Sequence, residues 1–314
     1  MQGRTIRIGT RGSPLALWQA GHVRDRLMAA HGLSAADVEI TVIKTSGDQI
    51  QDRPLSEVGG KGLFTKEIEE ALIAGTVDLA VHSMKDVATA LPDGLVIGAV
   101  LPREDVRDAF ISPRYGALAD MPAGAKVGTS SLRRQAQVKA LRPDLEVVQF
   151  RGNVETRLKK LADGVADATF LACAGLNRLG LADRITRRVE VEEMLPAVAQ
   201  GAVGIEIRGD DQDARRWIAP LDCPATSLCV MAERTFLATL EGSCRTPIGG
   251  LARLAGDRLV LDGQILTPDG TRNYLTRREG AASSAIAIGA AAGEELLERA
   301  GGTAFFADVA ERSW

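Results

Sequence analysis

Arginine side chains follow several strand-to-helix turns of this sequence, at places that suit the binding of an anion. Arg11 lies in the turn at residues 10–13, and Arg133 and Arg134 come just after the turn at residues 129–131. A helix N-terminus offers free N–H groups and the positive end of the helix dipole, which attract an anion. Helix capping alone accounts for the serines of both turns, but cations there oppose the dipole unless an anion joins them. The two turns therefore predict an anion-binding site.

Three further arginines occupy corresponding positions. Arg151 follows a predicted strand, Arg157 lies on the next helix, and Arg178 follows another apolar strand. Ligands of α/β sheets bind at the carboxyl ends of the strands, and the guanidinium fork matches carboxylate or phosphate. A GC-rich genome explains an excess of arginine over lysine equally well. The prediction of an anion-binding site therefore rests on where these arginines lie and not on their total number.

A lysine and an aspartate follow a third strand. Lys85 and Asp86 end the run His82-Ser-Met-Lys-Asp86, directly after a buried strand. A carboxylate in a sheltered cleft stabilises a developing cation or moves a proton. The alternative is a solvated Lys–Asp pair in a turn, and for His82 the expected role is packing.

Two loops complete the candidate chemistry. Cys244, in the loop at residues 240–247, has Arg245 beside it, which lowers the pKa of a thiol and favours the thiolate; a small buried side chain is the alternative. The Gly-rich run 59–65 contains Lys61 but lacks the spacing of a phosphate-binding P-loop. We interpret it as a cover over a cleft or as a plain surface loop. The 4 cysteines and 3 histidines are scattered, which predicts no metal site.

Alternating strands and helices must position these groups. We expect strands at residues 4–9, 39–45, 78–82, 146–150 and 168–172, and helices at 14–31, 64–74, 132–141 and 155–162. This order predicts parallel sheets covered by helices, and Ser13 and Pro14 are typical of a helix N-cap and first position. The turn and helix at 126–141 repeat those at 8–31, so two similar α/β lobes are the simplest interpretation.

The composition changes near residue 220. A helix at 226–240 precedes alternating strands at 250–255, 258–266 and 273–278 and a final helix at 284–300, an order typical of an α+β domain. The net charge of −3 and only 4% aromatic residues argue against nucleic-acid binding. No apolar run is long enough for a membrane span and no signal-peptide pattern is present. We therefore expect a cytoplasmic protein without a membrane partner.

The sequence resembles the porphobilinogen deaminase (hydroxymethylbilane synthase) family over nearly its whole length. The resemblance lies in six blocks in the family's order: RGSPLALWQ at 11–19, GGKGLF at 59–64, AVHSMKD at 80–86, VGTSSLRR at 127–134, RGNVETR at 151–157 and AGLNRLG at 174–180. Several long motifs in the right order are far more specific than any one of them.

The resemblance implies a transferase of porphyrin and heme biosynthesis. Such an enzyme joins four porphobilinogen molecules head to tail, with loss of ammonia, to give the linear tetrapyrrole hydroxymethylbilane. A dipyrromethane cofactor primes the chain and would be held by a thioether bond to Cys244. Each pyrrole unit carries an acetate and a propionate, for which clustered arginines are natural counter-ions. Asp86 would be the catalytic carboxylate, which binds pyrrole N–H groups and stabilises the cation left when ammonia departs.

The resemblance also implies the remaining site residues. Those expected to bind the cofactor are Lys85, Asp86, Thr129, Ser130, Ser131, Arg133, Arg134 and Arg157. Those expected to bind substrate are Arg11, Ser13, Gln19, Arg151, Arg178 and Gln200. Lys61 would belong to a mobile lid at residues 47–62.

The family fold is α/β, with two doubly wound lobes resembling type II periplasmic binding proteins and a small α+β third domain. The first lobe would contain residues 1–101 and 202–219, the second 102–201, and the third, with the attachment cysteine, 220–314. The expected partners are the substrate and a downstream enzyme that cyclises the product, and the chain would be a monomer. Three residues depart from the family pattern: Ala88 replaces a proline, and Ala199 and Ser243 replace glycines. Ser243 bears on how efficiently Cys244 is loaded.

Two other functions fit parts of the sequence. A non-catalytic, two-lobed anion-binding protein would use the lobes and the arginines, but it gives no role to a third domain with a loop cysteine. A cysteine-dependent transferase acting on another polyanion would keep Cys244 free and open to alkylation. A bound dipyrromethane, which colours with Ehrlich's reagent, distinguishes the family function from both.

Overall fold

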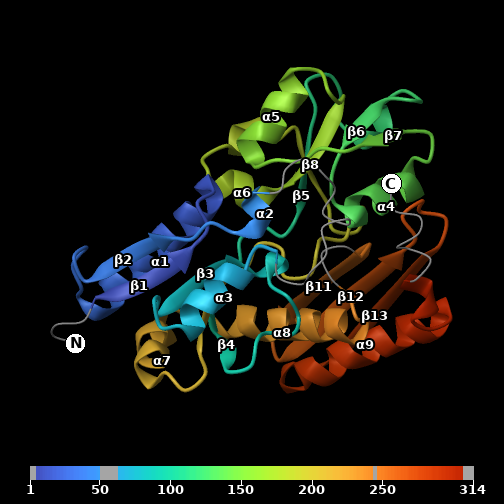
Figure 1. The fold of residues 1–314 in the computed structure, drawn as a ribbon. Coiled ribbons are helices and arrows are strands. Elements are labelled where there is room, and N and C mark those ends of the chain that lie inside the picture. Colours follow the sequence, from blue (N-terminus) through green and yellow to red (C-terminus); the bar gives the residue numbers. More distant parts are fainter. Residues whose placement is uncertain (1–4, 50–62, 243–245, 307–314) are drawn as a thin grey trace. The chain divides into compact units, whose positions relative to one another are not determined.

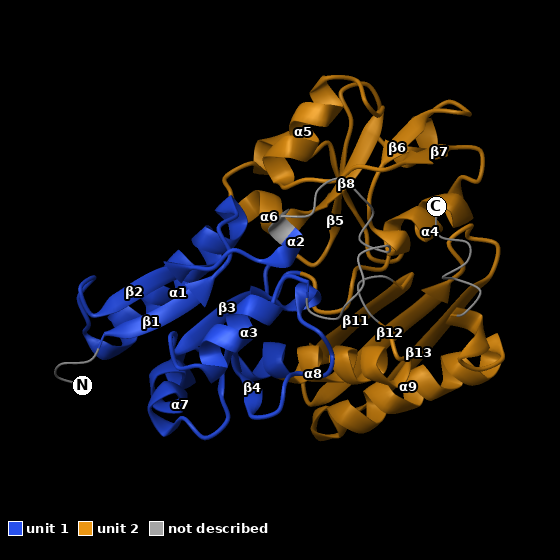
Figure 2. Ribbon diagram, in the orientation of Figure 1, with its two compact units in different colours: residues 1–51, 60–104, 201–227 blue, residues 52–59, 105–200, 228–314 orange. Residues whose placement is uncertain are grey.

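Within the part of the chain that the structure describes, two five-stranded sheets and one three-stranded sheet form the framework (Figure 1). The computed structural model describes residues 5–49, 63–242 and 246–306. These residues fall into two compact units (Figure 2). Unit 1 takes its described residues from 1–51, 60–104 and 201–227, and unit 2 takes them from 105–200 and 228–314.

The sheet of unit 1 has the strand order β2-β1-β3-β10-β4. Its strands are β1 (Ile6–Thr10), β2 (Val38–Val42), β3 (Leu79–Ser83), β4 (Leu95–Val100) and β10 (Val203–Arg208). Its helices are α1 (Pro14–His31), α2 (Ser46–Gln49), α3 (Lys66–Ile73) and α7 (Gln212–Ile218). Strand β1 is parallel to β2 and β3, and β10 is antiparallel to β3 and β4. The carboxyl ends of β1 and β3 therefore lie at the same edge of the sheet.

Apolar cores cover both faces of this sheet. On one face, Ile8 of β1 belongs to a buried cluster with Val23 and Leu27 of α1. On the other face, Ala80 of β3 belongs to a cluster with Leu72 of α3. Because successive side chains of a strand point to opposite faces, neighbouring residues supply both cores. The prediction of a doubly wound α/β lobe is confirmed.

The sheet of unit 2 repeats this plan, with the strand order β7-β6-β8-β5-β9. Its strands are β5 (Asp108–Ile111), β6 (Lys126–Gly128), β7 (Glu146–Val148), β8 (Ala168–Ala172) and β9 (Arg187–Val189), and its helices are α4 (Leu132–Leu141), α5 (Val154–Ala162) and α6 (Cys173–Arg178). Strands β7, β6 and β8 are parallel, whereas β5 is antiparallel to β8 and β9. The predicted repeat of two similar lobes is therefore confirmed.

The three-stranded sheet is antiparallel, in the order β11-β12-β13. It contains β11 (Ile248–Ala255), β12 (Arg258–Leu266) and β13 (Asn273–Ala281), accompanied by α8 (Pro224–Thr239) and α9 (Ala285–Ala300). The predicted order of helix, strands and helix is confirmed. By Cα proximity this sheet belongs to unit 2 together with the second five-stranded sheet, and the division into three domains stays a prediction.

Several predicted elements are shorter than expected, among them the strand predicted at 39–45, which ends at Val42. The strand predicted at 146–150 ends at Val148, because the Phe150 N–H donates to Ser130 Oγ at 3.1 Å instead of to a neighbouring strand. The helix predicted at 64–74 begins at Lys66 and ends at Ile73, and Phe64 lies beside the Arg11 guanidinium group. By contrast, α1 and α4 have the predicted bounds.

Candidate active site

A pocket of about 60 Å³ lies where the carboxyl ends of β1 and β3 meet in unit 1. It is far smaller than a typical pocket for a whole ligand, which is roughly 300–1,000 Å³, so it suits one substituent or one ring of a larger molecule. Four sequence-predicted site residues, together with His82, contribute to its wall. The lining residues are Arg11, Ser13, Leu15, Ala16, Gln19, Phe64, Thr65, Val81, His82, Ser83 and Asp86.

The turn after β1 brings Arg11 and Ser13 to this pocket. Ser13 caps α1, its Oγ accepting from the Ala16 N–H at 3.3 Å, with Pro14 at the first helical position. The Arg11 guanidinium carbon lies 4.2 Å from the centre of the Phe64 ring, a cation–π contact that holds the side chain in place. The pocket thus contains a positioned cation beside a helix N-terminus.

The turn after β3 brings Asp86 to the same pocket. Asp86 ends a short 3₁₀ helix, Met84–Asp86, and is half-buried. The turn is anchored by Met84, which is 1% exposed and whose N–H donates to Ala202 O at 3.0 Å. Gly204 on β10 makes this anchor possible, since a Cβ there would lie 2.0 Å from the Met84 sulfur. Lys85 lies on the same turn and is half-buried.

The polar side chains Gln19, His82 and Ser83 line the same pocket as Asp86. The Gln19 amide donates to Ser83 Oγ at 2.9 Å, and His82 Nε2 lies 3.0 Å from Glu206 Oε2 on the neighbouring strand β10. Burial raises the pKa of the Glu69 carboxyl on α3, and Glu206 raises it further. The sequence predicts a packing role for His82 and gives no signal for Glu206, because the two residues are 124 positions apart in the chain.

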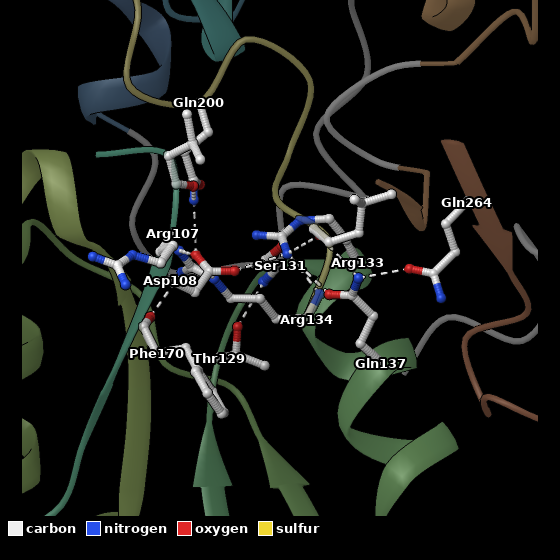
Figure 3. A network of polar contacts seen from close by, with 12 residues as sticks. Arg107, Asp108, Thr129, Ser131, Arg133, Arg134, Gln137, Phe170, Gln200 and Gln264 are labelled. Atoms are coloured by element: carbon white, nitrogen blue, oxygen red, sulfur yellow. Dashed lines mark hydrogen bonds and ion pairs between the residues drawn. The ribbon is translucent and has the colours of Figure 1, made fainter. Parts of the chain in front are cut away.

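Unit 2 contains a buried charge cluster at the corresponding edge of its sheet (Figure 3). An Arg134 terminal nitrogen lies 2.6 Å from Asp108 Oδ1, and Arg133 lies 2.8 Å from Oδ2 of the same carboxylate. Gln200 Nε2 donates to Asp108 Oδ1 at 3.0 Å. Asp108 is fully buried and the two arginines are each 4% exposed. The cluster therefore holds two cations against one anion.

The topology explains why Asp108 meets these arginines. Asp108 begins β5, which is antiparallel to β8, and it pairs with Ala172 at the end of β8. The arginines follow β6, which is parallel to β8. Although burial alone raises the pKa of Asp108, the two guanidinium groups lower it well below its usual range. Sequence reasoning missed Asp108, because its place depends on an antiparallel pairing that local patterns do not reveal.

The Nε of Arg133 is an unused donor. One of its terminal nitrogens also donates to Gln137 Oε1 and Leu195 O, both at 2.9 Å, whereas Nε is buried without a hydrogen-bond partner among the described residues. A buried unpaired donor is costly, and the cluster has one positive charge in excess. Both features fit a bound carboxylate.

The other predicted residues of unit 2 lie at the same edge. Thr129 Oγ1 accepts from the Ser131 N–H at 3.1 Å, and Ser131 caps α4. Arg151 and Arg157 follow β7, Arg157 donating to Gly152 O at 2.9 Å, and Arg178 ends α6 after β8. Because β6, β7 and β8 are parallel, these groups gather at one edge. Cys244 and Lys61 lie outside the described residues.

Three cysteines fall within the described ranges. Cys173 and Cys229 are buried, and burial raises the pKa of the Cys173 thiol to about 12. Cys223 is half-buried, and a hydrogen bond from Thr226 Oγ1 at 3.3 Å lowers the pKa of its thiol. Those ranges contain no cluster of His, Cys, Asp or Glu side chains suited to a metal ion. Nor does any helix within them have the length and apolar character needed to cross a membrane.

Two family models match this chain. Residues 6–216 match "Porphobilinogen deaminase, dipyromethane cofactor binding domain", and residues 227–298 match the C-terminal domain of the same family. The chain belongs to the porphobilinogen deaminase family. Porphobilinogen deaminase of Nitrobacter winogradskyi is 62% identical over 94% of this chain and 93% of its own length. The Paracoccus denitrificans enzyme is 60% identical over 94% of each. The chain is accordingly an enzyme, a transferase of porphyrin biosynthesis.

Some solved structures of other proteins are similar to part of this chain. The methionine-binding protein MetQ has a TM-score of 0.45 and 15% identity, covering 69% of this chain and 89% of that protein. A periplasmic substrate-binding protein from Coxiella burnetii has a TM-score of 0.43 and 15% identity, covering 71% and 94%.

Proposed function

We propose that the chain joins four porphobilinogen molecules head to tail, releasing ammonia, to give hydroxymethylbilane, and that a dipyrromethane bound to Cys244 through a thioether primes the reaction. The observation that carries this proposal is the excess of buried positive charge at Asp108, Arg133 and Arg134, at the carboxyl edge of a sheet. Pyrroles with acetate and propionate arms are the polyanions that such an edge suits.

The donors that unit 2 contributes fit the dipyrromethane. The carboxylates of this cofactor would be held by Arg133, through the unused Nε, and by Arg134 and Arg157, and Lys85, which belongs to unit 1, is a further predicted cation. Thr129, Ser130 and Ser131 would add hydroxyl groups. When bound, the dipyrromethane supplies the free pyrrole α-carbon to which the first substrate unit is joined.

Asp86 would act on the substrate in the pocket of unit 1. Loss of ammonia breaks the bond from the aminomethyl carbon to nitrogen, and the electron pair leaves with nitrogen. The pyrrole ring then carries the positive charge, and a half-buried carboxylate beside its N–H stabilises that charge where it develops. The substrate's own carboxylates would be held by Arg11, Arg151 and Arg178, with Ser13, Gln19 and Gln200 as neutral partners.

Several predictions about the whole chain stay proposals. They are the three domains (1–101 with 202–219, 102–201, and 220–314), a lid that includes Lys61, a monomeric state and a cytoplasmic location. We further propose that the product passes to an enzyme that cyclises tetrapyrroles.

The intact mass of the denatured protein tests the proposal. Wild type is compared with Cys244→Ala after incubation with porphobilinogen, and Cys223→Ser is the matched control, since hydrogen bonding favours thiolate at Cys223. We expect a mass excess of one dipyrromethane in wild type and Cys223→Ser but not in Cys244→Ala. A bare polypeptide mass in all three would contradict the proposed function, and an excess lost only in Cys223→Ser would contradict the attachment site.

A further inference from the structure

A chain of side-chain amides connects α4 to the three-stranded sheet (Figure 3). Gln137 Nε2 on α4 donates to Gln264 Oε1 on β12 at 2.7 Å, and Gln264 Nε2 donates to Asn273 Oδ1 on β13 at 2.9 Å. Gln137 and Gln264 are 3% and 8% exposed. A buried amide pair that joins residues 127 positions apart is not needed to form either element.

Arg133 and the Leu195 carbonyl, which accepts from Gln137 Nε2 at 2.9 Å, together fix the direction of the bonds in this chain. A guanidinium group can only donate, so Gln137 must turn its oxygen to Arg133 and its NH₂ to Gln264. Gln264 must then present its oxygen to Gln137 and its NH₂ to Asn273. Hydrogen bonds aligned in this way polarise one another. The orientation of Arg133 and that of the two glutamines therefore depend on each other.

The backbone holds α4 against the same hairpin. Gly270, in the turn between β12 and β13, has φ of +73°, and a Cβ there would lie 2.3 Å from Ala140 N and 2.8 Å from Ala136 O of α4. The hairpin and the helix are thus in direct backbone contact within one turn of Gln137.

A second path joins the three-stranded sheet to Asp108. The buried Glu233 carboxylate on α8 accepts from the Ala199 N–H at 2.6 Å and from the Ala252 N–H of β11 at 2.7 Å. The residue after Ala199 is Gln200, which donates to Asp108. The three-stranded sheet is therefore connected to the charge cluster through two separate sets of hydrogen bonds.

We propose that Gln264 is a positioning residue, which orients the Arg133 guanidinium through Gln137 so that its unused donor meets a carboxylate of the bound polypyrrole. This inference rests on the proposed function, because it assigns Arg133 to the cofactor's carboxylates. It gives the three-stranded sheet a role in anion binding in addition to carrying the attachment loop.

The test is the rate of cofactor loading in three full-length proteins: wild type, Gln264→Leu and the double variant Gln137→Leu/Gln264→Leu. Each is prepared from cells that make no porphobilinogen and then incubated with it, and the gain in intact mass is followed with time. Asn273→Asp, which keeps the surface acceptor for Gln264, is the matched control. Thermal midpoints are measured in parallel.

Loading is expected to be about ten-fold slower in Gln264→Leu, as follows from loss of a hydrogen bond coupled to a charged group, and unchanged in Asn273→Asp. The double variant removes both polar partners, so its thermal midpoint is expected to exceed that of Gln264→Leu, while loading stays slow. If the loading rates of the variants simply follow their thermal midpoints, Gln264 has a structural role and the inference is overturned. A loading rate in Gln264→Leu equal to that of wild type would also overturn it. If wild type itself gains no mass, the proposed function fails instead.

Discussion

Asp86 and Asp108 are carboxylates at the carboxyl edges of two similar sheets, but their surroundings differ. Asp86 follows β3, is half-buried and lines a pocket. Asp108 begins β5, is fully buried and lies between two guanidinium groups. The first can meet a ligand directly, whereas the second neutralises charge inside the protein. Substitution of the two should therefore have separable effects on activity and on stability.

Asp86→Asn is expected to lower the rate of hydroxymethylbilane formation by about 10²–10³, the range found when one group that stabilises a developing charge is removed. The fold and the covalent mass excess are expected to persist, because the amide keeps the shape of the side chain. Steady-state assays with intact-mass measurement check this. Near-normal product formation would remove Asp86 from its proposed role.

Asp108→Asn is expected to lower the free energy of unfolding at pH 7 by about 3–5 kcal/mol, because it leaves two buried arginines without their counter-ion. The folded-state pKa of Asp108 is lowered, so its contribution is present above the unfolded pKa near 4. It is lost as pH falls toward the folded pKa. Urea unfolding at several pH values should show the difference from wild type shrinking below about pH 4.

The exposed Asp25, paired with Arg24 on α1, provides a control for this prediction. Asp25→Asn is expected to change stability by less than about 1 kcal/mol, as is usual for surface ion pairs. Equal losses in the two variants would mean that burial of Asp108 between the arginines has no special energetic weight.

At the scale of elements, the turn that follows α8 contains a residue in an unfavourable conformation, Glu241. The Glu241 N–H donates to Ala238 O at 2.9 Å and the Gly242 N–H donates to Leu237 O at 2.9 Å, which is a Schellman motif. In this motif, Glu241 occupies the position with left-handed backbone conformation, at φ of +52°. Glycine is favoured at such a position because it has no Cβ to clash with the backbone. Glu241→Gly should therefore raise the free energy of unfolding by about 1 kcal/mol.

The same substitution at Glu294, exposed within α9, is the matched control. Glu294→Gly is expected to lower stability by up to about 1 kcal/mol, because glycine is a poor residue in a helix interior. Thermal or urea unfolding of the two variants should give shifts of opposite sign. Two shifts of the same sign would show that backbone conformation does not govern the effect at Glu241.

The sequence predicts those elements whose signals are local. Helix α1 has its predicted bounds because Ser13 and Pro14 define its start, and the repeated turn before α4 revealed the second lobe. The predicted strand at 146–150 is too long, because the side chain of Ser130, in a distant turn, accepts the hydrogen bond from the Phe150 N–H.

The site divides in the same way. Arg133, Arg134 and Asp86 can be singled out from residue type and position after a strand, and their roles in the site stay predictions. Asp108 and Gln264 cannot be singled out in this way, since an ordinary charged or polar residue gains its role only from partners brought by the fold. The pairing of Gln137 with Gln264 spans 127 positions, a distance over which helix and strand periodicity carries no information.

For the whole molecule, the contacts of unit 2 predict which parts lose stability together. Asp108 belongs to β5, yet Gln137, Gln264 and Glu233 connect the charge cluster to the three-stranded sheet. The apolar cluster around β1 and α1 lies entirely in unit 1. Loss of the Asp108 carboxylate should therefore destabilise β5, β6, β8 and β11–β13, while β1 and β3 are little affected.

Hydrogen exchange measured by mass spectrometry on wild type and Asp108→Asn checks this prediction peptide by peptide. Segments of cooperative structure lose protection together, so faster exchange in β11–β13 alongside β5 is the expected result. If exchange rises in the second five-stranded sheet alone, the three-stranded sheet is stable on its own. The amide chain would then join two separate domains, as the boundary predicted near residue 220 implies. The coupling of Gln264 to Arg133 would be weaker than the hydrogen bonds through Gln137 indicate.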